Sequence, residues 1–295
     1  MFRVRRLLAP FVLCIALLFS EAQAFTIAWL SDTQNYHNAY KPIFDGMTQW
    51  IADNRAALDI RFVFHTGDVV GSWRSEDQWR QARESMDILS SASIPFLAAC
   101  GNHDIGYRMN YANFLKYVLS LRPASMSQEY GDTGSRYELF SANGRDYIFM
   151  GIAFSNKGPS EDEVNWINGV LRQYSSRDAI IITHSYLKKS ASYTTQGKAI
   201  FEKIVKANPN VFLVLCGHCR DISYKNVQLD DDGDGNPDRT VYAILSNFQG
   251  SKAGGGGYMR ILDFRDSDIY IYTYSPYYDS REYPKGKTEA TVPLP

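Results

Sequence analysis

Several common functional features are missing from this chain. It has no block of basic residues, and 31 Lys and Arg against 32 Asp and Glu give a net charge of −1, so nucleic acid is not indicated as an obligate partner. No Asn begins an Asn-x-Ser/Thr sequence, so glycosylation is not expected. The absence of a Gly-x-Ser-x-Gly segment excludes a serine nucleophile of that type.

Long apolar runs are also absent. The run from Leu7 to Phe19 is about 13 residues long, whereas a membrane-spanning helix needs about 20. Arginines precede this run and Ala22-Gln23-Ala24 follows it, a pattern typical of a secretory signal peptide. We therefore predict a signal peptide at 1–24, a single domain at 25–295, no membrane span after cleavage, and a secreted or periplasmic location. A permanent membrane anchor is the alternative.

Cysteine is scarce. Cys100, Cys216 and Cys219 follow the predicted signal, and an odd number means that at least one of them is free or pairs between chains in an oxidising compartment. Cys216 and Cys219 form a single C-x-x-C around His218, and a second C-x-x-C is absent. We expect small buried apolar side chains at strand ends, with a local disulfide as the alternative.

The residues with chemical potential are concentrated in five short strings, and each string follows an apolar run of strand length. The strings are Ser31-Asp32-Thr33-Gln34, Gly67-Asp68, Gly101-Asn102-His103-Asp104, Thr183-His184 and Gly217-His218-Cys219-Arg220. They supply carboxylate, imidazole and amide groups, which are the ligands of a hydrolytic metal site. A metal site needs such groups to converge from separate strands on one rigid rim.

Hydrophobic periodicity predicts alternating strands and helices, followed by antiparallel strands. Asn143-Gly144 lies between two apolar runs and predicts a tight hairpin. Ser160 is the expected N-cap of a helix, with Glu163 as its capping-box partner. The expected strands are 26–30, 60–64, 94–99, 136–140, 147–153, 179–183 and 211–216, with further strands within 222–274. The expected helices are 42–58, 75–92, 111–121, 161–174 and 198–208.

The five strings, in this order and at these strand ends, resemble the motif series of the calcineurin-like metallophosphoesterases. The resemblance extends over nearly all of 25–295, and Asp32-Thr33-Gln34 is similar to a subfamily that opens with Asp-Thr-Gln. It implies an α/β fold, a four-layer αββα sandwich of two mixed sheets with helices on both outer faces. It also implies hydrolysis of phosphate mono- or diesters in a small phosphorylated substrate, by attack of a metal-bound water.

The resemblance also assigns metal ligands, and here the chain departs from its family. The positions that match the first metal site are Asp32, Gln34, Asp68 and Arg220. The positions that match the second site are Asp68, Asn102, His184 and His218. The family has imidazoles where this chain has Gln34 and Arg220, whereas the second set is complete. We therefore expect one tight and one weaker site for divalent ions, namely Mn, Fe, Zn or Mg.

The altered first site has chemical limits. Asp32, Gln34 and Asp68 offer only oxygen atoms, which suit magnesium, manganese or calcium better than zinc. Arg220 cannot ligate a cation, because a guanidinium group has no acceptor. Our hypothesis is that Arg220 binds a substrate phosphate. The alternatives are that it faces solvent or pairs with a carboxylate such as Asp221.

His103 is the other candidate catalytic side chain. The resemblance implies that it acts as a general acid or stabilises the transition state, with Asp104 orienting it. Asp230, Asp232, Asp234 and Asp238 match part of a calcium-loop pattern, although the twelfth position is Val241, and a polar hairpin turn is the favoured interpretation. The alternative function is a catalytically weak protein that binds metal or phosphate on the same scaffold.

Overall fold

The computed structural model describes residues 24–121, 127–283 and 289–295. The signal peptide predicted at 1–24 lies outside these residues, except for Ala24. Among the residues described, no helix has both the length and the apolar character that a membrane crossing requires.

The first of two β-sheets has six strands in the order β13-β12-β11-β1-β2-β3. These strands are β1 (Phe25–Leu30), β2 (Ile60–His65), β3 (Phe96–Ala98), β11 (Met259–Phe264), β12 (Asp268–Tyr274) and β13 (Ala290–Pro293). β1, β2 and β3 run parallel, and the other neighbours pair antiparallel, so the sheet is mixed.

The second sheet has seven strands in the order β4-β5-β6-β7-β8-β10-β9. They are β4 (Ser127–Tyr130), β5 (Ser135–Ala142), β6 (Arg145–Ile152), β7 (Asp178–Thr183), β8 (Val211–Cys216), β9 (Asp221–Leu229) and β10 (Arg239–Asn247). β6, β7, β8 and β10 are parallel to one another, and both edges are antiparallel.

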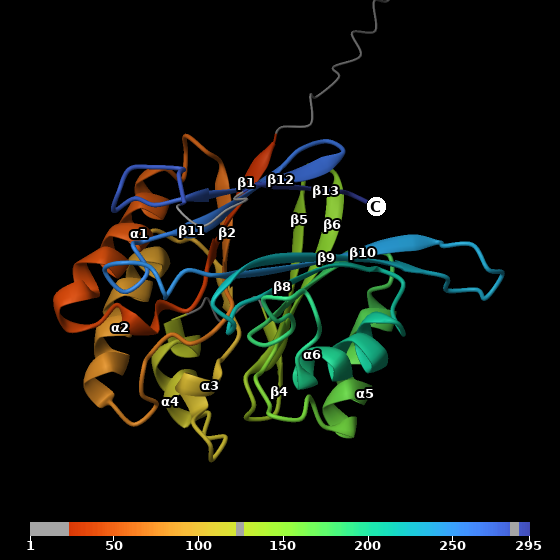
Figure 1. Cartoon of the computed structure of the whole chain (residues 1–295), viewed down its shortest axis with the longest axis horizontal. Helices are drawn as coiled ribbons and strands as arrows, with labels where there is room; N and C mark the ends of the chain where they lie inside the picture. The colour runs from red at the N-terminus through yellow and green to blue at the C-terminus, as the bar shows by residue number, and fades with distance from the viewer. Residues whose placement is uncertain (1–23, 122–126, 284–288) are drawn as a thin grey trace, which may run out of the picture.

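Helices cover the outer faces of both sheets (Figure 1). The helices on the first sheet are α1 (Lys41–Asp53), α2 (Glu76–Ser91), α3 (Asn102–Ile105) and α4 (Ala112–Tyr117). Those on the second sheet are α5 (Glu161–Gln173) and α6 (Thr195–Ile200), which continues into the π-helical η4 (Phe201–Val205). Short 3-10 turns are η1 (Thr33–Asn35), η2 (Asn38–Tyr40) and η3 (Leu119–Leu121). The predicted four-layer αββα sandwich is confirmed.

The inner faces of the two sheets form an aromatic core. In β1, Ile27 and Trp29 face this core, whereas Ala28 and Leu30 face the helices, so every residue of the strand is buried. The Phe149 ring of the second sheet packs edge-to-face against Phe64 of the first, with ring centroids 4.8 Å apart. Such pairs add about 0.5–1.5 kcal/mol beyond the burial of their area.

Several predicted elements differ in their bounds. The helix expected at 42–58 ends at Asp53, and the helix expected at 198–208 begins earlier, because the Thr194 side chain caps it by accepting from Gly197 N (2.9 Å). Ser160 is the N-cap of α5 as predicted, but the Glu163 carboxylate accepts from Ser135 Oγ instead of completing a capping box.

The sheet topology brings the five strings together. Each string follows the carboxyl end of a strand in the parallel part of its sheet: β1, β2, β3, β7 and β8. Since the carboxyl ends of parallel strands lie at one edge of a sheet, all five loops meet at one rim of the sandwich. The tight hairpin predicted at Asn143-Gly144 is confirmed, with φ of 53° and 73° at these two residues.

Candidate active site

Three of the predicted metal ligands have an unusual backbone conformation. φ is 51° at Asp32, 54° at Asp68 and 69° at His218, which is the left-handed region that non-glycine residues avoid. Such residues cost about 1–3 kcal/mol each and persist only where the surrounding structure fixes them. Here the loops fix one another: Asp32 N, for example, donates to Gly67 O at 3.1 Å. This conformation at three of the predicted ligands, in loops that fix one another, favours a functional site here.

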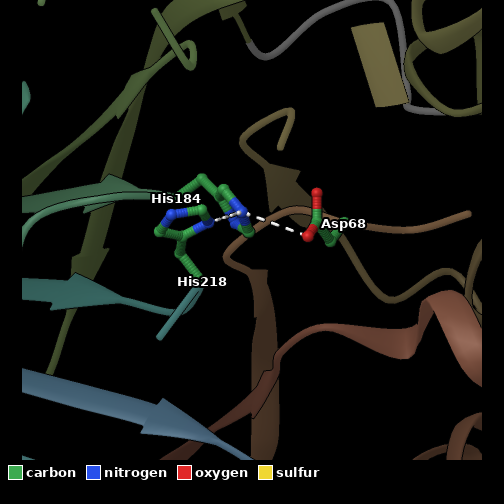
Figure 2. Close-up of side chains that lie close together, drawn as sticks. All are labelled: Asp68, His184 and His218. Carbon is green, nitrogen blue, oxygen red and sulfur yellow. Dashed lines mark hydrogen bonds and ion pairs between the residues drawn. The ribbon is translucent and has the colours of Figure 1, made fainter. Parts of the chain in front are cut away.

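The His184 imidazole is the centre of the second ligand set, and Figure 2 shows it between Asp68 and His218. Its Nε2 lies 3.2 Å from Asp68 Oδ2, 3.1 Å from His218 Nδ1 and 3.1 Å from Asn102 Oδ1. The three predicted partners of His184 therefore converge on a single atom. A carboxylate, an amide oxygen and two imidazoles at this spacing form a donor set for a divalent ion.

Neighbouring backbone groups orient these ligands. His184 Nδ1 donates to Thr66 O at 2.9 Å, which directs Nε2 toward the cluster. Asp68 Oδ1 accepts from His103 N at 2.9 Å, which leaves Oδ2 for the cluster. Partners of this kind fix the tautomer and direction of metal ligands, and their loss costs about 10- to 100-fold in affinity or activity.

The protonation of the cluster is set by burial and by close charges. Burial lowers the pKa of His184, but the Asp68 and Asp32 carboxylates more than offset this and raise it to about 9. Burial raises the pKa of Asp68, but His184 beside it brings the net value below the usual one. Burial and the charge of His184 lower the pKa of His218 to about 4, so His218 is neutral near pH 7.

The first ligand set also fits a cation. Gln34 is buried, and within the part of the chain that the structure describes its Oε1 has no hydrogen-bond partner. Burial raises the pKa of Asp32 to about 7, although its carboxylate accepts from His218 N (3.2 Å) and from Ser31 Oγ. A buried acceptor without a donor and a buried carboxylate both cost free energy, which a bound cation would offset.

The structure places His103 differently from Asp104. His103 is exposed beside the cluster, and its Nδ1 donates to Gly71 O at 2.8 Å, which leaves Nε2 without a hydrogen-bond partner among the described residues. Asp104 is fully buried and accepts three backbone N–H bonds, from Val69 (2.8 Å), Val70 (3.0 Å) and Gly101 (2.7 Å). The prediction that Asp104 orients His103 is therefore wrong. The Gly71 carbonyl orients that ring, and Asp104 joins two ligand-bearing loops.

Arg220 is exposed, and its Cδ lies next to Gly250. Asp221, considered as a partner for Arg220, pairs with Lys189 at 2.6 Å. The role of Arg220 in phosphate binding stays a prediction. Its position two residues after His218 and its exposure leave the guanidinium accessible to a substrate.

The sequence analysis assigned no role to His65 or Thr33, although both contact the site. His65 Nδ1 accepts from Gly67 N (3.1 Å), its Nε2 donates to Thr33 Oγ1 (3.0 Å), and Thr33 Oγ1 donates to Val69 O (3.4 Å). Burial lowers the pKa of His65 to about 3, so its ring is neutral. This chain of bonds ties the Asp32 loop to the Asp68 loop. The position of Thr33 inside the first string was the available sequence signal.

The cysteines and the acidic turn are the other residues that the sequence analysis singled out. Cys100, Cys216 and Cys219 are free thiols; the first two are buried, as predicted, and Cys219 is half-buried. Carboxylate oxygens of Asp230, Asp232 and Asp238 lie within 4.8 Å of one another in the exposed turn between β9 and β10. Asp230, Asp232, Asp234 and Asp238 all accept backbone N–H groups of this turn, as expected for a polar hairpin turn.

Comparisons with known proteins agree with this geometry. The sequence model of the calcineurin-like phosphoesterases matches residues 25–219. The uncharacterized protein YvnB of Bacillus subtilis (strain 168) is 40% identical over 265 residues, which are 88% of this chain but only 20% of that protein. The chain thus spans about one fifth of the length of this relative.

Two solved structures are similar in fold. A dimetal phosphatase from Danio rerio superposes with a TM-score of 0.61 at 13% identity, over 91% of this chain and 98% of that one. GAP50, described as the anchor in the inner membrane complex of Plasmodium, gives a TM-score of 0.59 at 14% identity, over 92% and 89%. Together with the motif geometry, the match over 25–219 shows that the chain belongs to the calcineurin-like phosphoesterase family, whose members are hydrolases of phosphoester bonds.

Proposed function

We propose that this protein hydrolyses phosphate mono- or diesters of small molecules with the aid of divalent metal ions. The observation that carries the proposal is the convergence of Asp68, Asn102 and His218 on His184 Nε2, next to an exposed His103. A further proposal is that Asp32-Thr33-Gln34 marks a subfamily in which an amide oxygen replaces an imidazole in the first metal site.

Each of the two ligand sets would hold one cation. Asp68, Asn102, His184 and His218 would hold one cation tightly, and Asp32, Gln34 and Asp68 would hold the second more weakly. When bound, such ions supply Lewis acidity and lower the pKa of a water molecule. Mn, Fe, Zn or Mg would suit the second ligand set, which contains His184 and His218. The first ligand set offers only oxygen atoms and favours Mg or Mn.

His103 would serve the departing group. Its ring is held by the bond from Nδ1 to Gly71 O, so Nε2 is the atom that can hold a proton for the leaving oxygen. General acid catalysis of this kind contributes about 10²- to 10⁴-fold. Arg220 would bind the substrate phosphate bidentately and replace part of the charge of a weakly held cation.

Metal removal tests the proposed activity. The purified protein should hydrolyse p-nitrophenyl phosphate or bis(p-nitrophenyl) phosphate, lose this activity after dialysis against EDTA, and regain it with Mn, Mg, Zn or Fe. Asn102→Ala should abolish the activity, whereas Asn226→Ala, which changes an exposed asparagine on β9, should not. Failure to hydrolyse either ester with any of the four metals would overturn the proposal.

A second candidate is a binding protein of low turnover on the same scaffold. The replacement of two imidazoles by Gln34 and Arg220 favours it, and the likeness to GAP50 shows that an anchor protein can have this fold. The complete second ligand set and the exposed His103 favour hydrolysis. Tight binding of Mn²⁺ and phosphate without turnover of either ester would favour the binding protein.

We also propose that the protein is secreted or periplasmic. The proposal depends on the arginines, the short apolar run and Ala22-Gln23-Ala24 near the N-terminus. Cleavage should leave Phe25 as the first residue, as found by N-terminal sequencing of the protein recovered from outside the cytoplasm. Recovery of the protein with residues 1–24 still attached would contradict this location.

A further inference from the structure

A cavity of about 330 Å³ adjoins the metal-ligand cluster on the side of His218. His218 and Cys219 form one wall, and the ends of β6 and β7 and the start of α6 form the others. Its volume is at the small end of the range for ligand sites, about 300–1,000 Å³. A substrate whose phosphate lies at the cluster would extend its other end into this cavity.

Most of the lining side chains are polar and uncharged. Ser155, Ser185, Thr194 and Thr195 supply hydroxyl groups, and Asn156 supplies an amide. The side chains of Asn156 and Thr195 are exposed and have no hydrogen-bond partner in the described part of the chain, so their polar atoms are available to a ligand. Hydroxyl and amide groups of this kind bind the hydroxyls and anionic oxygens of a polar ligand.

The floor of the cavity is rigid. The buried Gln196 donates from Nε2 to Ala153 O (2.8 Å) and accepts at Oε1 from Ser155 N (3.3 Å), so it joins α6 to the end of β6. The aromatic ring of the lining, Phe154, is buried and packs against His184 and His218, with ring centroids 5.8 and 6.0 Å apart. It therefore offers little face on which a nucleobase could stack.

One lining residue carries a full charge, the exposed Lys188. Its backbone is fixed in a short hairpin: Lys188 N donates to Ser192 O (2.8 Å), and Lys188 O accepts from Ser223 Oγ (3.0 Å). Lys188 has no carboxylate partner among the described residues, whereas its neighbour Lys189 pairs with Asp221 at 2.6 Å.

We propose that this cavity recognises a second anionic group of the substrate, a carboxylate or a second phosphate, through Lys188 and the surrounding hydroxyl and amide groups. The preferred substrate is then a small phosphate ester that carries hydroxyl groups and another anion. The inference rests on the proposed phosphoesterase activity, because it assigns a substrate class to the same site. An ammonium group without a carboxylate partner in a polar, rigid cavity is suited to this role.

Matched substrates test the inference. Glycerol 3-phosphate and 3-phosphoglycerate differ only in a hydroxymethyl group against a carboxylate, and fructose 6-phosphate and fructose 1,6-bisphosphate differ in a second phosphate. Phosphate release should show a higher kcat/KM for the compound with two anionic groups, the doubly anionic member, in at least one pair. The pair that shows this preference identifies the anion as carboxylate or phosphate.

Lys188→Met should then lower the ratio of kcat/KM within that pair by about 10- to 150-fold, as expected for one charge-assisted hydrogen bond. Lys189→Met is the matched control, because it removes a neighbouring lysine whose charge is already paired, and it should keep the ratio. Equal kcat/KM within both pairs, or a ratio that Lys188→Met leaves unchanged, would overturn the inference.

The phosphoesterase proposal and the anion-site inference can fail independently of each other. If none of the four compounds and neither nitrophenyl ester is hydrolysed with any metal, the phosphoesterase proposal is wrong, and calorimetric binding of the same pairs decides the inference. Tighter binding of the doubly anionic member that depends on Lys188 would support the anion site, and equal binding within both pairs would refute it.

Discussion

Asp104 offers a sharp test of how the site is held together. Its Oδ1 accepts from Val69 N and Val70 N, and its Oδ2 accepts from Gly101 N. The first two amides follow Asp68, and the third precedes Asn102, the two residues that we propose as metal ligands. Asp104→Asn keeps one oxygen for the pair of amides but turns an NH₂ group toward Gly101 N–H, so that two donors face each other in a fully buried place.

The magnitude follows from these bonds. A buried N–H that loses its acceptor costs about 1–3 kcal/mol. In a protein of this size, 1 kcal/mol lowers Tm by about 2–4 °C, so Asp104→Asn should lower Tm by about 2 to 12 °C. Because both ligand loops lose a shared anchor, the affinity for Mn²⁺ should fall by about 10- to 100-fold.

Thermal unfolding by circular dichroism and calorimetric titration with Mn²⁺ measure these effects. Asp266→Asn, at an exposed position between β11 and β12, is the matched control and should change neither quantity. His103→Gln should lower turnover while Tm and Mn²⁺ affinity stay the same. If Asp104→Asn lowers only turnover and leaves Tm and Mn²⁺ affinity unchanged, Asp104 does orient His103 and our assignment is refuted.

Four further outcomes are expected. Metal analysis of dialysed protein should find about one tightly bound transition metal per chain, and two equally tight zinc ions would contradict the weaker first site. Asp68→Asn should lower metal content and activity together, whereas His103→Ala should retain the metal; loss of metal in the latter would contradict its role as an acid. Arg220→Ala should weaken inhibition by phosphate and lower kcat/KM by about 10- to 150-fold, and Arg220→His should tighten the first metal; no change in either would mean that Arg220 does not contact substrate. Burial raises the pKa of Glu163 above its usual 4.5, so the folded chain holds this proton to higher pH than the unfolded chain. The free energy of unfolding therefore falls as pH rises from the pKa of Glu163 in the unfolded chain to its higher pKa in the folded chain. Glu163→Gln should flatten this decline in denaturant unfolding measured from pH 4 to 8, and an unchanged curve would contradict the assignment.

The sequence contained enough information for the layers of the fold and for the convergence of Asp68, Asn102 and His218 on His184. Strands such as β1 are buried on both faces and therefore appear as continuous apolar runs, and polar side chains directly after such runs are expected at one rim. The α/β alternation and the hairpin at Asn143-Gly144 were predictable for the same reason, because they depend on local patterns of apolar and turn residues.

Features that depend on distant partners were not predictable from local patterns. The region after 222 was expected to form antiparallel strands, but β10 runs parallel to β8. The place of β10 in the sheet depends on long-range pairing, which local patterns do not reveal. The Glu163 carboxylate in α5 accepts from Ser135 Oγ on β5 instead of completing the expected capping box. Asp104 and His65 bind atoms about 35 residues away or in another string, so their roles depend on how the loops pack.

The packing of these loops also explains why the strings are informative only as a set. A Cβ added at Gly217 would lie 2.3 Å from Asp32 Oδ2, and one added at Gly101 would lie 2.2 Å from Asp68 Oδ1. Real Cβ atoms do not approach other atoms so closely, so each of these glycines leaves room for a carboxylate that belongs to a different string. A single Gly-Asp or Gly-His dipeptide has no such meaning, because the contact that requires its glycine comes from another part of the sequence. Five strings in the right order carry a specific structural signal, since each one provides the space or the hydrogen bonds that hold the ligands of the others.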